Sequence, residues 1–194
     1  MDKFIRVDDY LAAETWTGLL AFFERSVQWS YGWQSDLTKT PLAHLNHDFL
    51  RTHRANQDDA SRALADDPSL AILNRLWQKL KIDYLPGHAL VRCYANAHVY
   101  GIEGDVHVDS NLPGNYTTIF YVVPQWQVDW AGETVLINEF GDIVHAVVPR
   151  PNRMMIFDGR IRHAARAVHR KFTGLRVTLM FKSRQEGASS DGAG

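Results

Sequence analysis

From Ala89 onwards the sequence consists of short β-branched and aromatic runs separated by turn residues, with no helix-length periodic stretch between them. Parallel strands need long, usually helical, crossover connections, so this pattern excludes a parallel sheet with alternating helices. It predicts a mainly β jelly roll, that is, a cupin-like double-stranded β-helix of two antiparallel sheets. Eight runs are expected to be strands: Ala89–Ala97, Asp105–Asp109, Thr117–Val123, Glu133–Ile137, Ile143–Pro149, Arg153–Phe157, His163–Val168 and Leu175–Lys182.

The first part of the chain has a helical pattern instead. Apolar residues at helical spacing predict an amphipathic helix from about Ala12, and Ser69 is expected to N-cap a second helix. The aperiodic segment Trp29–Asp67 between them is interpreted as a functional loop. We expect one domain over residues 1–183, with helical support and a candidate lid in 1–88, the jelly roll in 89–183, and a flexible tail over 184–194.

Composition removes several classes of function. The chain of 194 residues has a formal charge of −1 and no basic block, which argues against binding to a nucleic-acid backbone. Cys93 is the only cysteine, so an intramolecular disulfide and a cysteine-based zinc site are excluded. The acidic N-terminus is unlike a signal peptide, and no apolar stretch approaches the ~20 residues of a membrane span. A soluble cytoplasmic protein is expected.

The second run carries the pattern His107-x-Asp109. Residues two apart on a strand point to the same face, so both side chains can reach one point. An imidazole beside a carboxylate suits Fe(II), and a second imidazole would complete a facial triad. The pattern alone is common, and a solvated strand edge with a local His–Asp hydrogen bond is the simpler interpretation.

His163 changes this balance, because it opens the seventh run, and the second and seventh strands of an eight-stranded jelly roll are neighbours. It can therefore approach His107 and Asp109. The alternatives are that His163 is a turn residue bonded to backbone, or that His169 is the distal ligand. His169 is disfavoured because it lies so close to Arg176.

Arg176 opens the otherwise apolar last run, and an arginine is seldom buried without a partner. Its planar fork matches a carboxylate, and Thr178 faces the same way and could add a hydroxyl donor. The alternative is an exposed arginine at a strand end that has no chemical role.

Taken in order, these features resemble the 2-oxoglutarate/Fe(II) dioxygenase superfamily, and within it the catalytic domain of prolyl 4-hydroxylase-like proteins. The resemblance extends over about Leu90–Lys182. The matching elements are Arg92-Cys93-Tyr94, His107-x-Asp109, Ile119-Phe120-Tyr121, Ala131-Gly132-Glu133-Thr134, Pro149-Arg150-Pro151-Asn152-Arg153 before Met154–Phe157, His163, and Arg176-x-Thr178.

The resemblance implies an enzyme that consumes 2-oxoglutarate and O2, releases succinate and CO2, and hydroxylates or desaturates an unactivated C–H bond. The substrate would be a small molecule or an amino-acid residue, free or in a peptide. Fe(II) would be held by His107, Asp109 and His163. The residues implied to bind 2-oxoglutarate are Arg176, Tyr121, Tyr94 and Thr178, with Arg166 and Arg170 as rivals of Arg176.

Substrate selection is expected to lie outside the triad, in Trp33, His44, Asn46 and Tyr100, although packing or surface roles are the simpler interpretation of each. Two other functions stay open. One is oxidative demethylation of nucleic acid, whose enzymes in this superfamily carry a second arginine where this chain has Lys182. The other is a non-catalytic jelly-roll module with a structural metal. The sequence leaves the oligomeric state open.

Overall fold

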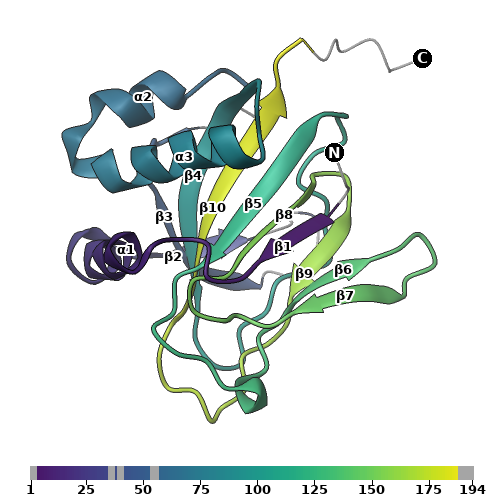
Figure 1. The fold of residues 1–194 in the computed structure, drawn as a ribbon. Helices are drawn as coiled ribbons and strands as arrows, with labels where there is room; N and C mark the ends of the chain where they lie inside the picture. Colours follow the sequence, from purple (N-terminus) through teal and green to yellow (C-terminus); the bar gives the residue numbers. More distant parts are fainter. Residues whose placement is uncertain (1–3, 35–37, 39–41, 53–56, 188–194) are drawn as a thin grey trace.

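Two antiparallel sheets face each other in the computed structural model, which describes residues 4–34, 38, 42–52 and 57–187 (Figure 1). The predicted double-stranded β-helix is therefore confirmed. The major sheet has seven strands, in the spatial order β1 (Phe4–Val7), β8 (Met154–Asp158), β5 (Asn115–Tyr121), β10 (Arg176–Gln185), β4 (His88–His98), β3 (Ala43–Asp48) and β2 (Ser30–Gln34). The minor sheet has three, in the order β7 (Ile143–Val147), β6 (Thr134–Ile137) and β9 (Arg162–Ala165).

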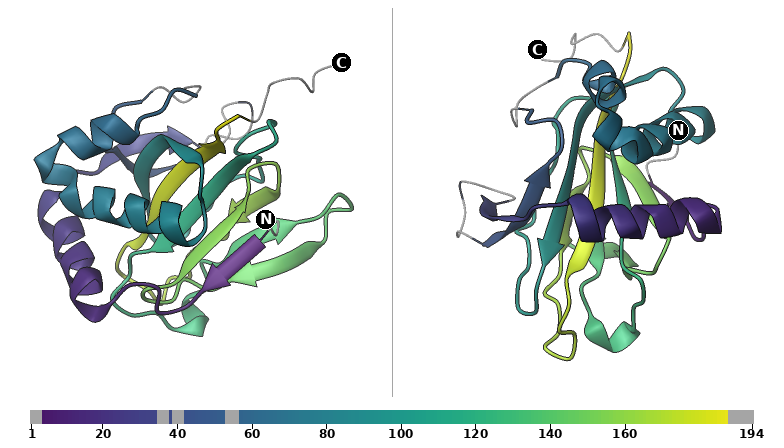
Figure 2. Two further views of the ribbon diagram at one scale, coloured as in Figure 1. Left: turned by 45° about the horizontal axis from the view of Figure 1, so that its top comes forward. Right: turned by 90° about the vertical axis from the view of Figure 1, so that its left-hand side faces the viewer.

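The helices cover the face of the major sheet that points away from the minor sheet (Figure 2). They are α1 (Ala13–Ser26), α2 (Ser61–Asp66) and α3 (Ala71–Asp83), with short 3-10 turns at Pro68–Leu70 and Val128–Trp130. Leucines and Trp77 of these helices form one apolar core with the sheet. None of the helices in the described ranges has the length and apolarity of a membrane span.

The two central strands, β4 and β10, separate this helical core from the space between the sheets. Successive side chains of a strand point to opposite faces. Cys93, Leu179 and Phe181 pack in the helical core, whereas Tyr94 and Met180 belong to the core between the sheets. Because of this alternation, one face of each central strand packs in the helical core, and the other face can line a site between the sheets.

Three expectations about local structure were wrong. Strands β1 to β3 lie in the part expected to hold helical support and a candidate lid but no strands. The alternation of β3 is hidden because its buried positions are the polar residues His44 and Asn46. The Asp67 carboxylate, rather than Ser69, caps the second helical region, accepting from the Ser69 amide at 2.9 Å. Residues 184 and 185 belong to β10 instead of the expected tail, and residues 188–194 of that tail lie outside the described ranges.

Candidate metal and co-substrate site

The segment expected to be the second strand forms only a single β-bridge, between His107 and His163. The amide of each histidine donates to the carbonyl of the other, at 3.0 and 2.9 Å. Two residues further on, the Asp109 amide donates to the Gly159 carbonyl at 2.9 Å. The single bridge and the Asp158–Gly159 turn therefore hold His107 and Asp109 beside strand β9, where a full neighbouring strand was expected.

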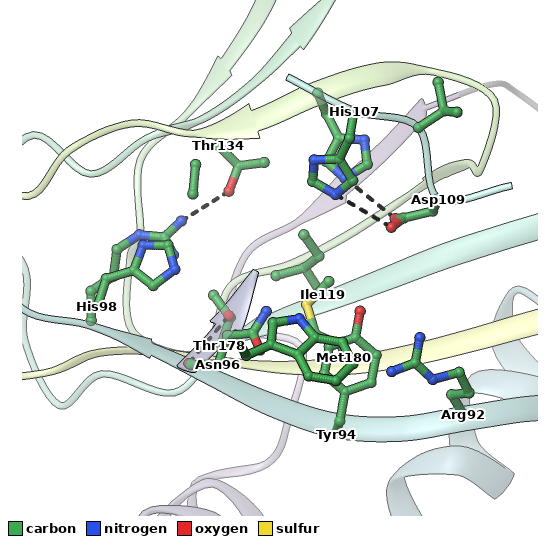
Figure 3. Close-up of a pocket in the computed structure, with 15 residues that line it drawn as sticks. Arg92, Tyr94, Asn96, His98, His107, Asp109, Ile119, Thr134, Thr178 and Met180 are labelled. Carbon is green, nitrogen blue, oxygen red and sulfur yellow. Dashed lines mark hydrogen bonds and ion pairs between the residues drawn. The ribbon is translucent and has the colours of Figure 1, made fainter. Parts of the chain in front are cut away.

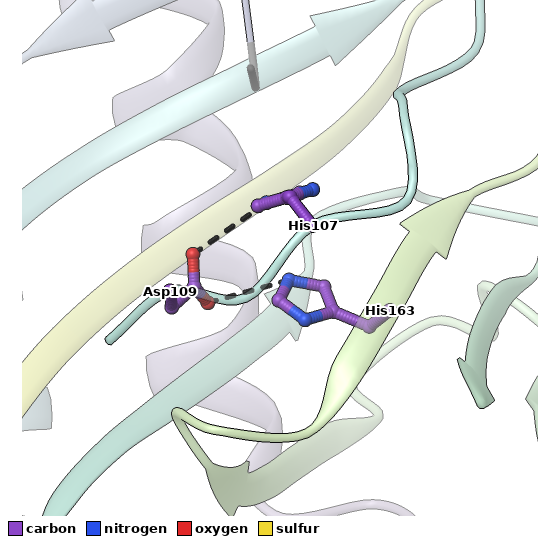
Figure 4. Close-up of side chains that lie close together, drawn as sticks. All are labelled: His107, Asp109 and His163. Carbon is purple, nitrogen blue, oxygen red and sulfur yellow. Dashed lines mark ion pairs between the residues drawn. The ribbon is translucent and has the colours of Figure 1, made fainter. Parts of the chain in front are cut away.

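Ligand atoms of His107, Asp109 and His163 all lie within 4.8 Å of one another (Figure 4). The distance from Nε2 to the nearer carboxylate oxygen of Asp109 is 3.6 Å for His107 and 3.3 Å for His163. The Nδ1 atoms face the carbonyls of Asp105 and Ile161, at 2.8 and 2.9 Å. A carbonyl can only accept, so each Nδ1 carries the proton and each Nε2 keeps a lone pair for a metal.

The carboxylate of Asp109 is held from its other side as well. Its Oδ2 accepts from the Thr117 hydroxyl at 2.6 Å and from the Lys182 ammonium. Burial raises the pKa of Asp109, but the nearby Lys182 and His163 outweigh it, so the pKa lies well below its usual value. Burial lowers the pKa of His163, against the opposing effect of Asp109. An ionised carboxylate and a neutral imidazole are the forms that bind a metal.

These residues line a cavity of about 140 Å³ between the two sheets (Figure 3). Its floor is a ladder of side chains from β4 and β10, which pair Tyr94 with Met180, Asn96 with Thr178 and His98 with Arg176. The lining is Trp33, Arg92, Tyr94, Asn96, His98, His107, Val108, Asp109, Ile119, Thr134, His163, Ala165, Arg176, Thr178 and Met180.

Arg176 is 2 % exposed and is fixed at one end of this cavity by β6 and the loop before it. Its Nε donates to the Gly132 carbonyl at 2.6 Å and its Nη2 donates to the Thr134 hydroxyl at 3.0 Å. Burial lowers the pKa of Arg176. A guanidinium has five donor hydrogens, and these two bonds leave others for a ligand carboxylate.

Three further residues were expected at the 2-oxoglutarate site. Tyr94 and Thr178 line the cavity. Tyr121 does not line it, because it lies behind Thr134, to whose hydroxyl it donates at 2.8 Å, and its ring lies 5.5 Å from the Arg176 guanidinium carbon. Tyr121 therefore holds Thr134, the residue whose hydroxyl accepts a hydrogen bond from Arg176.

The rivals of these residues lie elsewhere. The side chains of His169, Arg166 and Arg170 are exposed, and none of them lines the cavity. The structure thus brings His163 and Arg176, rather than their rivals, into one cavity with His107 and Asp109.

Of the residues expected to select the substrate, only Trp33 lines the cavity. His44 is buried against the ring of His98, with centroids 4.7 Å apart. Asn46 donates to the carbonyl of Ala95 at 3.0 Å, inside the sheet. Tyr100 is 62 % exposed in a loop. Strand β3 places its polar residues against β4 instead of over the cavity, which sequence periodicity did not reveal.

Among the contacts that sequence reasoning did not assign to the cavity or to the Asp109 carboxylate are those of Arg92, Asn96, His98 and Lys182. A signal for them exists. Each lies an even number of residues from Tyr94 on β4 or from Arg176 on β10, so the two-residue period of a strand puts them all on the same face as those residues.

Comparison with known proteins agrees with this architecture. Residues 93–181 match the model of the 2OG-Fe(II) oxygenase superfamily, so the resemblance predicted from the sequence is confirmed for the segment that supplies most of the cavity lining. Members of this family use Fe(II), 2-oxoglutarate and O2, and the His–Asp–His cluster is the candidate iron site. A search of curated proteins found no significant match.

Several solved structures share the fold at low sequence identity. A Trichoplax adhaerens prolyl hydroxylase in complex with a hypoxia inducible factor peptide has a TM-score of 0.69 at 13 % identity, covering 100 % of this chain and 89 % of that one. A Pseudomonas putida prolyl-4-hydroxylase has a TM-score of 0.63 at 16 % identity, covering 95 % and 94 %. HygX from Streptomyces hygroscopicus, solved with nickel, 2-oxoglutarate and hygromycin B, has a TM-score of 0.64 at 12 % identity, covering 95 % and 84 %.

Proposed function

We propose that this protein is an Fe(II)- and 2-oxoglutarate-dependent dioxygenase that hydroxylates or desaturates an unactivated C–H bond of a small molecule or an amino-acid residue. One observation carries the proposal: a preformed pair of imidazoles and one carboxylate shares a cavity with a buried arginine that has donors to spare. A non-catalytic jelly-roll module with a structural metal would have no need of a carboxylate clamp beside that metal.

The residues fit the metal and the co-substrate. His107, Asp109 and His163 supply two nitrogen donors and one oxygen donor, the set typical of non-haem iron sites with open positions. Arg176 and Thr178 would hold the distal carboxylate of 2-oxoglutarate. When bound, Fe(II), 2-oxoglutarate and O2 supply the oxidising chemistry, with succinate and CO2 as co-products.

The protein's own contribution is positioning and exclusion of water. The two Nδ1–carbonyl bonds fix the ring orientations of His107 and His163 before any metal arrives. Thr117 and Lys182 fix the carboxylate of Asp109 in the same way. Apolar side chains between these groups, such as Ile119 and Met180, keep the reacting region dry.

The substrate classes proposed here are suggested by the ligands bound in two structures of similar fold. One similar structure holds a peptide and another holds a small molecule, hygromycin B. A peptide or small-molecule substrate is therefore proposed here. Nucleic acid is not proposed, because the position of the second arginine in nucleic-acid dealkylases is Lys182, which is engaged with Asp109.

The proposal is tested by Fe(II)-dependent formation of succinate from 2-oxoglutarate under O2, with and without candidate substrates. Asp109→Ala should abolish succinate formation. Asp129→Ala, which removes an exposed partner of Lys171, is the matched control and should leave it unchanged. If Asp109→Ala forms succinate at the wild-type rate, or the wild type forms none with any candidate, the proposal is wrong and the structural-metal module is favoured.

A further inference from the structure

Arg92 is a buried cation without a hydrogen-bonded partner in the described part of the chain. It is 7 % exposed, and neither its Nε nor its Nη2 makes a hydrogen bond. Its guanidinium carbon lies 4.5 Å from the centre of the Tyr94 ring and 5.4 Å from the centre of the Trp33 ring. A buried polar group without a partner is costly, so this arrangement calls for an anion.

Lys182, the cross-strand neighbour of Arg92, adds to the positive charge that an anion would balance. In the ladder between β4 and β10, Arg92 lies directly opposite Lys182, and like charges in this position repel each other. Lys182 is paired with Asp109, but no acid of the described residues is paired with Arg92. A second, smaller cavity of about 50 Å³ is also lined by Arg92, Lys182 and Asp109.

Arg92 and Arg176 serve different ends of the main cavity. In Figure 3, Arg92 and Asp109 lie toward one end of the cavity and His98 and Thr134 toward the other, with Tyr94 between them. Arg176 donates to Thr134, so it belongs to that far side. Asp109, one of the candidate metal ligands, lies on the Arg92 side. A co-substrate held by Arg176 therefore leaves Arg92 for a second ligand.

Charge balance supports the same conclusion. Among the described residues lining the two cavities, three cations (Arg92, Arg176 and Lys182) accompany one carboxylate, Asp109. Fe(II) and 2-oxoglutarate carry equal and opposite charges, so binding both leaves the positive excess unchanged. A substrate with an anionic group would reduce it.

We propose that Arg92 is a substrate-binding residue that recognises a carboxylate of the substrate, with Lys182 adding to the positive potential. The inference rests on the proposed function and names its substrate class: a small carboxylic acid, such as a free amino acid or a hydroxy acid. The Arg92 guanidinium packs against the rings of Tyr94 and Trp33, which also contact each other with centroids 6.1 Å apart. A planar guanidinium offers a two-donor fork, which matches a planar carboxylate better than a tetrahedral phosphate.

The test uses protein loaded with Mn(II) and 2-oxoglutarate, which does not turn over. The probes are propionate, butyrate and the free amino acids, each compared with its primary amide, and methyl phosphate. Paramagnetic broadening of probe protons by Mn(II) reports binding beside the metal. The acids that bind should do so about tenfold more tightly than their amides, a difference of about 1.4 kcal/mol. Methyl phosphate should bind more weakly than those acids.

Variants assign the effect to Arg92. Arg92→Met should abolish the preference for acids without weakening 2-oxoglutarate binding, and Arg92→Lys should keep part of it. Arg62→Met, at a surface arginine 91 % exposed, is the control and should behave as the wild type. Arg92→Met should also raise the Tm by about 3 °C, because it removes an unpaired buried charge, whereas loss of a merely structural arginine would lower it.

Several results would overturn the proposal: acids bound equally by the wild type and Arg92→Met, amides bound as well as acids, or methyl phosphate bound more tightly than the acids. Loss of 2-oxoglutarate affinity in Arg92→Met would overturn it too, by making Arg92 a co-substrate ligand. Calorimetric titration of the same probes into metal-free protein repeats the comparison of Arg92→Met with Arg62→Met. Failure to bind Mn(II) would thus count against the iron site while Arg92 is still tested.

Discussion

Gly132→Ala should displace Arg176 and weaken 2-oxoglutarate binding, although the residue is neither a proposed ligand nor charged. Gly132 has a φ of +74°, and its carbonyl accepts from the Arg176 Nε. A Cβ added there would lie 3.1 Å from the Arg176 Cδ and 3.1 Å from the Trp126 Cζ2. Carbon atoms prefer separations of about 3.5–4.0 Å, so the arginine or its support must move.

A second glycine variant separates the backbone cost of the substitution from its effect on Arg176. Gly87 has a φ of +73°, and an added Cβ there would meet nothing within 4 Å. Both alanine variants bear the conformational cost of a left-handed residue, about 1–2 kcal/mol. Only Gly132→Ala also disturbs a charged hydrogen bond, worth about 1.5–3 kcal/mol. We expect Gly132→Ala to lose about 2.5–5 kcal/mol of unfolding free energy, and Gly87→Ala about 1–2 kcal/mol.

The assays are urea unfolding and an anaerobic titration of the Fe(II) protein with 2-oxoglutarate, followed by the charge-transfer absorption of the complex. The dissociation constant should rise about tenfold or more in Gly132→Ala, which corresponds to about 1.4 kcal/mol, and stay at the wild-type value in Gly87→Ala. Equal affinities in the two variants would refute the placement of the co-substrate carboxylate on Arg176.

Two further predictions concern the distal ligand and the edge of the major sheet. His163→Ala should abolish Fe(II) binding measured by equilibrium dialysis, whereas His169→Ala should keep it, and the reverse result would mean that the distal ligand was wrongly assigned. Asp8 accepts from the buried Arg153 at 2.5 and 2.9 Å, and this hydrogen bonding lowers the pKa of Asp8. Asp8→Asn should cost about 1–2 kcal/mol at pH 7 in urea unfolding, discounted because Asp8 is partly exposed. A folded-state pKa below 3.8 means that this contribution is present above that pH and lost below it, so an undiminished difference between the two proteins at pH 3 would contradict the assignment.

The sequence predicted the jelly roll because its strands alternate with turn residues and no helical crossover interrupts them. The metal cluster was also predictable in outline, since His107 and Asp109 are two residues apart and His163 follows a turn. The mechanism by which they meet was not, because a single β-bridge and the Gly159 carbonyl hold the segment that a full strand was expected to hold.

The remaining gaps come from long-range pairing. Strand β3 reads as irregular because its buried positions, His44 and Asn46, are polar. The environment of Arg92 depends on its register with Lys182, a residue that lies 90 positions later in the sequence. Local propensity carries no information about such register, so these contacts appear only when the sheet is assembled.

The most direct measurement of the proposed iron site is the anomalous scattering of a crystal grown without O2 in the presence of Mn(II) and 2-oxoglutarate. One metal peak should lie within bonding distance of the Nε2 atoms of His107 and His163 and of one Asp109 oxygen, with both Nδ1 atoms still bonded to carbonyls. A peak bound through either Nδ1, a peak at other residues, or no peak at saturating Mn(II) would contradict it.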